Sequence, residues 1–221
     1  MNILIIGASR GIGLEFARQY RTAGDRVIAT ARDDAGLERL RALDAVALNV
    51  DVANPASING LARQLDGEKI DVALYVAGVM TRFDARSSPT QPDFDHVMHT
   101  NVLGAMQAIA QVAPLVEAAQ GRFGFISSDM GRIAGVVSSY SWAYRVSKAA
   151  LNMAVASAKH DYPAAIFAAL SPGWVQTDMG GTGAPLSTYD SVTAMRNTLA
   201  QLKLADSGRF FGIDGKPMAS W

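Results

Sequence analysis

The sequence contains no cysteine, which excludes disulfide bonds, thiolate catalysis and cysteine-ligated metal sites. Basic and acidic residues number 20 each, so the formal net charge is zero. The basic excess that favours nucleic-acid or anionic-membrane surfaces is therefore missing. No apolar run is long enough to cross a bilayer, and the N-terminal stretch lacks the basic segment of a signal peptide. We expect a cytoplasmic protein with no nucleic-acid or membrane partner.

What is present is a chain of 221 residues, 49% hydrophobic and 18% charged, which fits one domain spanning residues 1–221. Expected strands are residues 3–6, 26–31, 45–50, 71–76, 122–127, 164–170 and 209–211. Expected helices are residues 14–23, 55–65, 93–119, 141–160 and 188–203, with a kink or adjustment at Pro114. This alternation predicts an α/β fold: a Rossmann-type, doubly wound parallel sheet of six to seven strands in three α/β/α layers.

A glycine-rich turn follows the first expected strand. Residues 7–13, called the glycine turn below, read Gly-Ala-Ser-Arg-Gly-Ile-Gly and lead into the first expected helix. Glycines let the backbone approach a pyrophosphate, and the free N–H groups of a helix start attract its charge. A tight turn with a close helix–strand contact would use the same residues, but three glycines at this place favour a dinucleotide site. The candidate cofactor ligands are Gly7, Ser9, Arg10, Gly11, Ile12 and Gly13.

The residue after the second expected strand indicates which dinucleotide binds. An NAD site places an acidic residue there to hold the ribose hydroxyls, whereas this chain has Arg32. Arg32 and Arg10 together suit a 2′-phosphate, so we favour NADP(H), with NAD(H) as the alternative. The alternative is that both arginines are ordinary solvent-exposed loop residues that bind no phosphate. The ends of later strands add a carboxylate for the adenine amino group and small residues beneath the cofactor: Asp51, Val52, Ala77 and Gly78.

Tyr144 and Lys148 are four residues apart in the expected helix 141–160, so their side chains emerge on one face. A free phenol has a pKa of about 10, and a fixed ammonium nearby favours the phenolate and lowers that pKa. The pair is therefore a candidate general acid or base. Such a pair alone is more often an ordinary surface pair, and it gains weight from the dinucleotide site. Ser127 and Ser128, at a strand end, can donate to a substrate carbonyl or simply end the strand.

Two further patterns concern the surroundings of the site. The Gly-rich stretch 178–187 predicts a mobile lid over it. His96 and His99 are three residues apart on an expected helix, the spacing of a metal-binding pair. No third ligand is evident, so we expect ordinary helix histidines and no metal site.

Several short segments occur in the order and spacing of one known family: the glycine turn, Asp51-Val52, Ala77-Gly78, Asn101-Val102, Ser127-Ser128, Tyr144-x-x-x-Lys148 and Pro172-Gly173. Together they resemble the short-chain dehydrogenase/reductase family over essentially the whole chain. Three longer segments resemble its C-factor and sniffer-like carbonyl reductase branch: residues 144–152, 171–181 and 209–215 with Trp221.

This resemblance implies roles for the candidate residues. Tyr144 would protonate a carbonyl oxygen in reduction or act as the base in oxidation, and Lys148 would lower its pKa and bind the nicotinamide ribose. Ser128 would polarise the carbonyl, and Asn101 would hold a water of a proton relay behind Lys148. The family transfers hydride directly from the nicotinamide and uses no metal. The nicotinamide side would be lined by Pro172, Gly173, Val175 and Thr177.

The resemblance also implies partners and a function. We expect a small-molecule carbonyl or alcohol substrate, and a homodimer formed through helices 93–119 and 141–160. The main hypothesis is NADPH-dependent reduction of a small or medium apolar aldehyde or ketone. The same site would serve an alcohol dehydrogenase in the oxidative direction. Because C-factor members are associated with signalling, a cofactor-binding regulatory protein with little turnover is the hypothesis from another class.

The chain departs from the family pattern at three places. Tyr75-Val76 replaces two asparagines that normally brace the central strands and contact the cofactor region, so this bracing is expected to differ. Ile6 replaces a threonine. Ser128 precedes Tyr144 by sixteen residues, a longer spacing than usual that the sniffer-like members share, so Ser127 is the lesser candidate.

Overall fold

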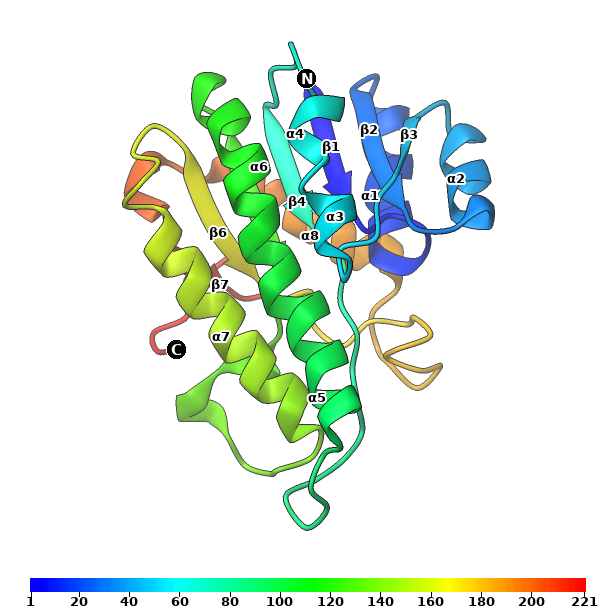
Figure 1. Ribbon diagram of the computed structural model, residues 1–221. Helices are drawn as coiled ribbons and strands as arrows, with labels where there is room; N and C mark the ends of the chain where they lie inside the picture. The colour runs from blue at the N-terminus through cyan, green and yellow to red at the C-terminus, as the bar shows by residue number, and fades with distance from the viewer.

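The computed structural model describes all 221 residues of the chain. Its strands are β1 (Asn2–Ile6), β2 (Arg26–Ala31), β3 (Val46–Asn49), β4 (Val72–Tyr75), β5 (Arg122–Ile126), β6 (Ile166–Leu170) and β7 (Arg209–Phe211). All pair in parallel in one seven-stranded sheet with the order β3-β2-β1-β4-β5-β6-β7 (Figure 1). The predicted doubly wound parallel sheet is confirmed, and the order changes direction between β1 and β4, the switch point where such folds bind ligands.

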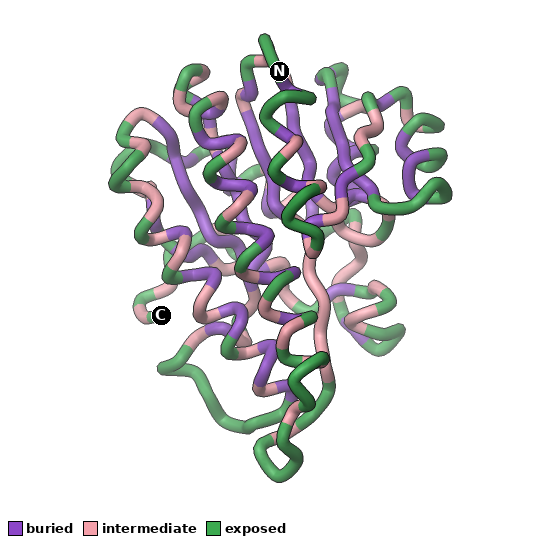
Figure 2. Tube along the Cα trace, viewed as in Figure 1, coloured by how far each residue is buried: buried purple, intermediate pink, exposed green.

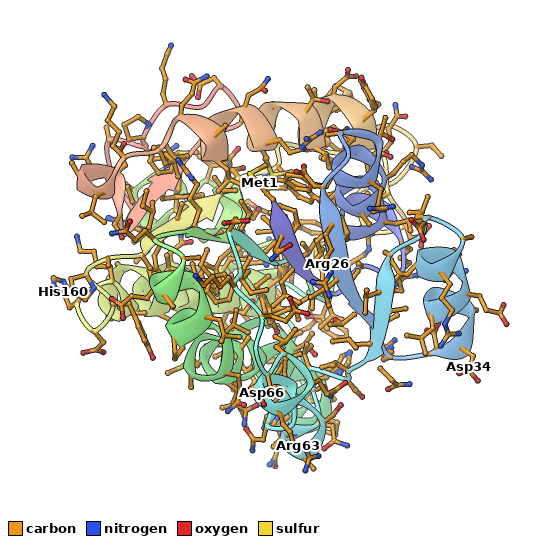
Figure 3. All side chains as sticks on the ribbon, turned by 90° about the horizontal axis from the view of Figure 1, so that it is seen from above. Met1, Arg26, Asp34, Arg63, Asp66 and His160 are labelled. Atoms are coloured by element: carbon orange, nitrogen blue, oxygen red, sulfur yellow. The ribbon has the colours of Figure 1, made fainter.

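Helices cover both faces of this sheet. They are α1 (Gly11–Thr22), α2 (Asp34–Arg41), α3 (Pro55–Ile58), α4 (Leu61–Gln64), α5 (Gln91–Met98), α6 (Gly104–Ala118), α7 (Trp142–Ala158) and α8 (Thr188–Gln201). α1 packs against α8 on one face, whereas α3, α4 and α7 pack against α6 on the other. Figure 3 shows these two layers from above, with Asp34 and His160 at opposite ends of the sheet. No helix is long and apolar enough to serve as a membrane span.

The strands read as continuous apolar runs because they are covered on both faces. Along β1, Ile3 and Ile5 join the core beneath α1 and α8, while Leu4 and Ile6 join the core beneath α6 and α7. All four are fully buried, and Figure 2 shows the central strands as buried along most of their length, whereas β3, at the edge of the sheet, is only partly buried. Ile6, one of the departures from the family, is thus a core residue.

Three stretches of helix differ from the prediction, and two of them lie between β2 and β4. The expected helix 55–65 is divided into α3 and α4, and Gly60, a poor helix former, lies at the junction. α2 was not predicted. Its first turn contains Gly36, and it is stabilised by Asp33, whose carboxylate accepts a hydrogen bond from the Gly36 amide.

The expected helix 93–119 is also not continuous. α5 and α6 are separated by a π-helix, His99–Leu103, in which the backbone widens for about one turn. Pro114 lies inside α6, so the main irregularity is at the π-helix and not at the proline. Such π turns are frequent at functional sites, and this one contains Asn101.

Candidate active site

The glycine turn brings β1 and α1 into a contact that leaves no room for side chains. A Cβ atom on Gly13 would lie 2.2 Å from the carbonyl oxygen of Gly7. Gly7 has φ +88°, and its Cβ would lie 2.6 Å from the amide nitrogen of Ala77. No side chain caps the start of α1, so its first N–H groups remain available to an anion. The structure therefore fits the predicted pyrophosphate site.

Three arginines belong to this turn or to the segments after β2, which adjoin it through α2. Arg32 is exposed and has no ion-pair partner. Arg10 pairs instead with Asp178 of the lid, Nη1 to Oδ2 at 2.8 Å. Arg39, on α2, donates from Nε to the carbonyl oxygen of Ser9 at 2.8 Å. The sequence prediction missed Arg39, and the amphipathic pattern of residues 34–41 is the signal that could have found it.

Tyr144 and Lys148 lie on one face of α7, as their spacing predicts. Both are buried, and Lys148 Nζ is 5.5 Å from the centre of the Tyr144 ring. The ammonium donates to the carbonyl oxygen of Ile126 at 2.7 Å, which holds it at the carboxyl end of β5. Burial lowers the pKa of Lys148 to about 8, because a buried ammonium is costly.

The pKa of Tyr144 differs from the prediction. We expected Lys148 to lower it, but burial raises the pKa of Tyr144 to about 12, and a hydrogen bond with Ser128 opposes the rise only in part. Loss of solvent destabilises the phenolate more than the neighbouring groups stabilise it. In the chain alone, the phenol therefore holds its proton firmly at neutral pH.

The structure separates the two serines at the end of β5. The Ser128 hydroxyl oxygen accepts from the Met130 amide at 3.1 Å, so its own proton is free to be donated. The Ser127 hydroxyl is buried and donates to the amide oxygen of Asn152 at 2.6 Å. Ser128 thus lies beside Tyr144, whereas Ser127 holds β5 against α7. The choice of Ser128 over Ser127 agrees with this geometry.

Asn101 is fully buried in the π-helix. Its side-chain oxygen accepts from the Val79 amide at 2.8 Å, and its nitrogen donates to the Val79 carbonyl and to the Ser147 hydroxyl, each at 2.9 Å. A Cβ atom on Gly78 would lie 3.4 Å from the Asn101 side-chain oxygen and 3.5 Å from Lys148 Nζ. The residues predicted from three distant segments therefore meet at one place.

The residues predicted to line the nicotinamide lie in the segment after β6, and this segment contacts the glycine turn. A Cβ atom on Gly11 would lie 3.5 Å from the Thr177 methyl carbon, so Thr177 faces the start of α1. Gly173 has φ +73°, and the Pro172 carbonyl accepts from Ser191 of α8 at 2.7 Å. Val175 is buried and pairs with Leu186 across the base of the lid. Asp51, by contrast, uses one carboxylate oxygen to accept from the Ala53 amide.

The predicted lid, residues 178–187, is attached by backbone hydrogen bonds of Leu186 at its base and by side-chain hydrogen bonds elsewhere. Arg82 donates to the Tyr140 hydroxyl at 2.9 Å and to the Met179 carbonyl at 3.1 Å, so it joins three loops. Trp174 donates from its indole nitrogen to the Gly180 carbonyl at 2.9 Å. Arg82 is a second residue that the sequence prediction missed, because nothing in its neighbourhood marks this contact.

Comparison with known proteins identifies the family. Residues 1–184 match the sequence model of the short chain dehydrogenase family. The chain belongs to that family. This confirms the resemblance drawn from the motifs and the expectation of an oxidoreductase.

Relatives within the short-chain dehydrogenases agree with the predicted branch. The C-signal of Myxococcus xanthus is 38% identical over 149 residues, covering 66% of this chain and 90% of the relative. The NADPH-bound carbonyl reductase from chicken fatty liver has a TM-score of 0.90 and 29% identity, covering 100% of this chain and 98% of that one. The carbonyl reductase Sniffer of D. melanogaster has a TM-score of 0.91 and 28% identity, covering 100% and 99%.

Proposed function

We propose that this short-chain dehydrogenase reduces the carbonyl group of a small or medium apolar aldehyde or ketone with NADPH. The observation that carries the proposal is the meeting of Tyr144, Ser128 and Lys148 beside the glycine turn. Arg32 and Arg39 beside that turn supply positive charge for a 2′-phosphate. The chicken carbonyl reductase, similar over the whole chain, binds NADPH. When bound, the cofactor supplies the hydride.

The proton chemistry follows from the side chains. The Ser128 hydroxyl, with its oxygen already accepting from Met130, donates a hydrogen bond to the substrate carbonyl oxygen. Tyr144 then transfers its phenolic proton to that oxygen, which completes the alcohol. The resulting phenolate is stabilised by the Lys148 ammonium, and the phenol is restored by a proton from solvent. Asn101 holds the Val79 loop and α7 in place during these steps.

The raised pKa of Tyr144 describes the form of this phenol in the chain alone. Burial keeps this phenol protonated at neutral pH, which suits a group that must donate a proton. Alcohol oxidation would need the phenolate as a base before substrate binds, and burial disfavours that form. Reduction and oxidation use the same residues in opposite directions, and the proposal of reduction is supported by the similarity to the NADPH-bound carbonyl reductase.

A second candidate function is a cofactor-binding signalling protein with little turnover. The 38% identity to C-signal of Myxococcus xanthus favours it. The two candidates share the cofactor site and differ only in whether a carbonyl compound is consumed.

We also propose a homodimer formed through the outer faces of α5, α6 and α7. Large apolar side chains are exposed there, which is typical of an interface: Phe94, Leu103, Met106, Val146 and Met153. Light scattering on a sizing column tests it, with Met106→Lys expected to give monomers.

The experiment that tests the function is a titration with NADPH and NADH followed by a panel of aldehydes and ketones. We expect NADPH to bind at least about tenfold more tightly, a difference of about 1.4 kcal/mol. Tyr144→Phe should lower kcat by about a hundredfold or more, because it removes the proton donor. Tyr189→Phe, on the exposed side of α8, is the matched control. NADPH binding without turnover would favour the signalling role, and binding of neither nucleotide would overturn both.

A further inference from the structure

Tyr75, which replaces a family asparagine, makes a specific contact at the end of β4. Its side chain is fully buried beside Phe125, with ring centres 6.3 Å apart. Its hydroxyl donates to the carbonyl oxygen of Thr100 at 2.6 Å. Burial raises the pKa of this phenol, so it remains a neutral donor. A buried hydroxyl that lost its partner would carry a desolvation cost, so the contact is strongly preferred.

The contact lies one residue from Asn101. Thr100 and Asn101 are both in the π-helix, whose backbone pattern differs from that of the α-helices on either side. Asn101 bonds to Val79, in the loop that follows Tyr75, and to Ser147. The Ser147 hydroxyl donates in turn to the Tyr144 carbonyl at 2.7 Å. Buried hydrogen bonds therefore connect β4 through the π-helix to the helix that carries Tyr144 and Lys148.

The absence of a side chain at Gly104 leaves room for the Tyr75 hydroxyl. A Cβ atom on Gly104 would lie 2.6 Å from the Tyr75 hydroxyl, closer than real Cβ contacts come, and 2.7 Å from the carbonyl oxygen of Val52. The first residue of α6 therefore lacks a side chain where the hydroxyl reaches the π-helix. Tyr75 and Gly104 fit together as a pair.

We propose that Tyr75 is a positioning residue for the active site: its hydroxyl fixes the π-helix that presents Asn101, in place of the family's asparagine brace. The inference rests on the proposed function insofar as it concerns catalysis. The contact itself exists in the chain alone, so it can be tested without turnover. The bracing that the Tyr75-Val76 departure put in question is thus supplied by a longer side chain that reaches a different partner.

The test compares Tyr75→Phe with wild type. Phenylalanine keeps the ring and removes only the hydroxyl, so the core packing is retained. Tyr162→Phe is the matched control, because Tyr162 packs on Phe167 at 5.8 Å in the same core, away from the π-helix. Amide hydrogen exchange is followed in residues 99–103 and in β5, and NADPH affinity and carbonyl reduction are measured in parallel.

In Tyr75→Phe we expect exchange in residues 99–103 to be about fivefold faster or more, with β5 unchanged. We expect kcat to fall about tenfold, equivalent to about 1.4 kcal/mol, while the Kd for NADPH stays within about twofold. The proposal would be overturned if residues 99–103 exchanged at the wild-type rate in Tyr75→Phe. It would also be overturned if Tyr162→Phe changed their exchange equally, or if exchange in Tyr75→Phe became faster throughout the sheet. If wild type reduces no carbonyl, the proposed function fails, and the exchange comparison still decides whether Tyr75 fixes the π-helix.

Discussion

At the carboxyl edge of the sheet, the glycine turn is held by buried contacts with β2, whereas the lid is held by backbone hydrogen bonds at its base and by exposed side chains elsewhere. The Gly7 amide donates to the Thr30 hydroxyl at 3.0 Å, and the Ala8 amide to the Thr30 carbonyl at 2.8 Å. Beyond the backbone hydrogen bonds of Leu186 at its base, the lid receives side-chain hydrogen bonds from Arg82 and Trp174. The proposed cofactor site thus lies on rigid elements. The lid, proposed to cover the substrate, consists of a segment whose sequence can change with little loss of stability.

The strongest test of this contrast is the same substitution in both regions. Gly13→Ala would bring a methyl group to 2.2 Å from the Gly7 carbonyl oxygen. We expect NADPH affinity to fall at least about a hundredfold, and the free energy of unfolding to fall by about 3 kcal/mol. In the lid, a Cβ atom on Gly183 would meet nothing within 4 Å, so Gly183→Ala should change both quantities little. Nucleotide titration and urea unfolding measure them, and equal losses in the two variants would contradict the contrast.

The second test concerns buried charge on the rigid side. Lys148 has its pKa lowered from 10.5 to about 8, so above pH 8 the folded chain holds fewer protons there than the unfolded chain. The stability of wild type should therefore rise relative to Lys148→Met, by about 2 kcal/mol between pH 8 and pH 10. Below pH 8 the difference should stay constant, with Lys148→Met the more stable. Urea unfolding across this range measures it.

Lys159 lies just after the same helix and is partly exposed, which makes Lys159→Met the control for the pH series. If Lys148→Met and Lys159→Met change alike between pH 8 and pH 10, the burial of Lys148 does not cause the change.

The smallest expected effect is on the lid. Arg82→Gln removes the hydrogen bonds to Tyr140 and Met179, each exposed and each worth about 0.5 kcal/mol. We expect KM for a carbonyl substrate to rise about threefold to fivefold with kcat nearly unchanged, and faster amide exchange in residues 178–187. Arg86→Gln, in the same exposed loop, is the control. A fall in kcat without a change in KM would mean that Arg82 acts on the chemical step.

The predictions from sequence succeeded where local pattern decides the structure. Strands such as β1 and β2 follow from short apolar runs, because only strands buried on both faces need them. The shared face of Tyr144 and Lys148 follows from their spacing alone, since helix geometry is fixed. The glycine turn is local only in part: Gly13 lies against the Gly7 carbonyl within one strand–turn–helix unit, whereas Gly7 itself lies against Ala77, after β4.

What the sequence did not reveal depends on contacts between distant segments. The π-helix at Asn101 is specified by partners such as Tyr75 and Val79, and no periodicity signals it. The pKa of Tyr144 was predicted in the wrong direction, because spacing shows the nearby lysine but not the depth of burial. Arg39 was missed together with α2, whose first turn resembles a loop in composition.

The pair formed by Tyr75 and Gly104 also constrains how this chain can diverge. If Tyr75 were replaced, one of the two atoms that exclude a side chain from position 104 would be gone. The other, the Val52 carbonyl oxygen, would still lie 2.7 Å from any Cβ atom there. A change at position 75 therefore requires a new brace for the π-helix, whereas position 104 requires glycine for as long as this backbone is kept.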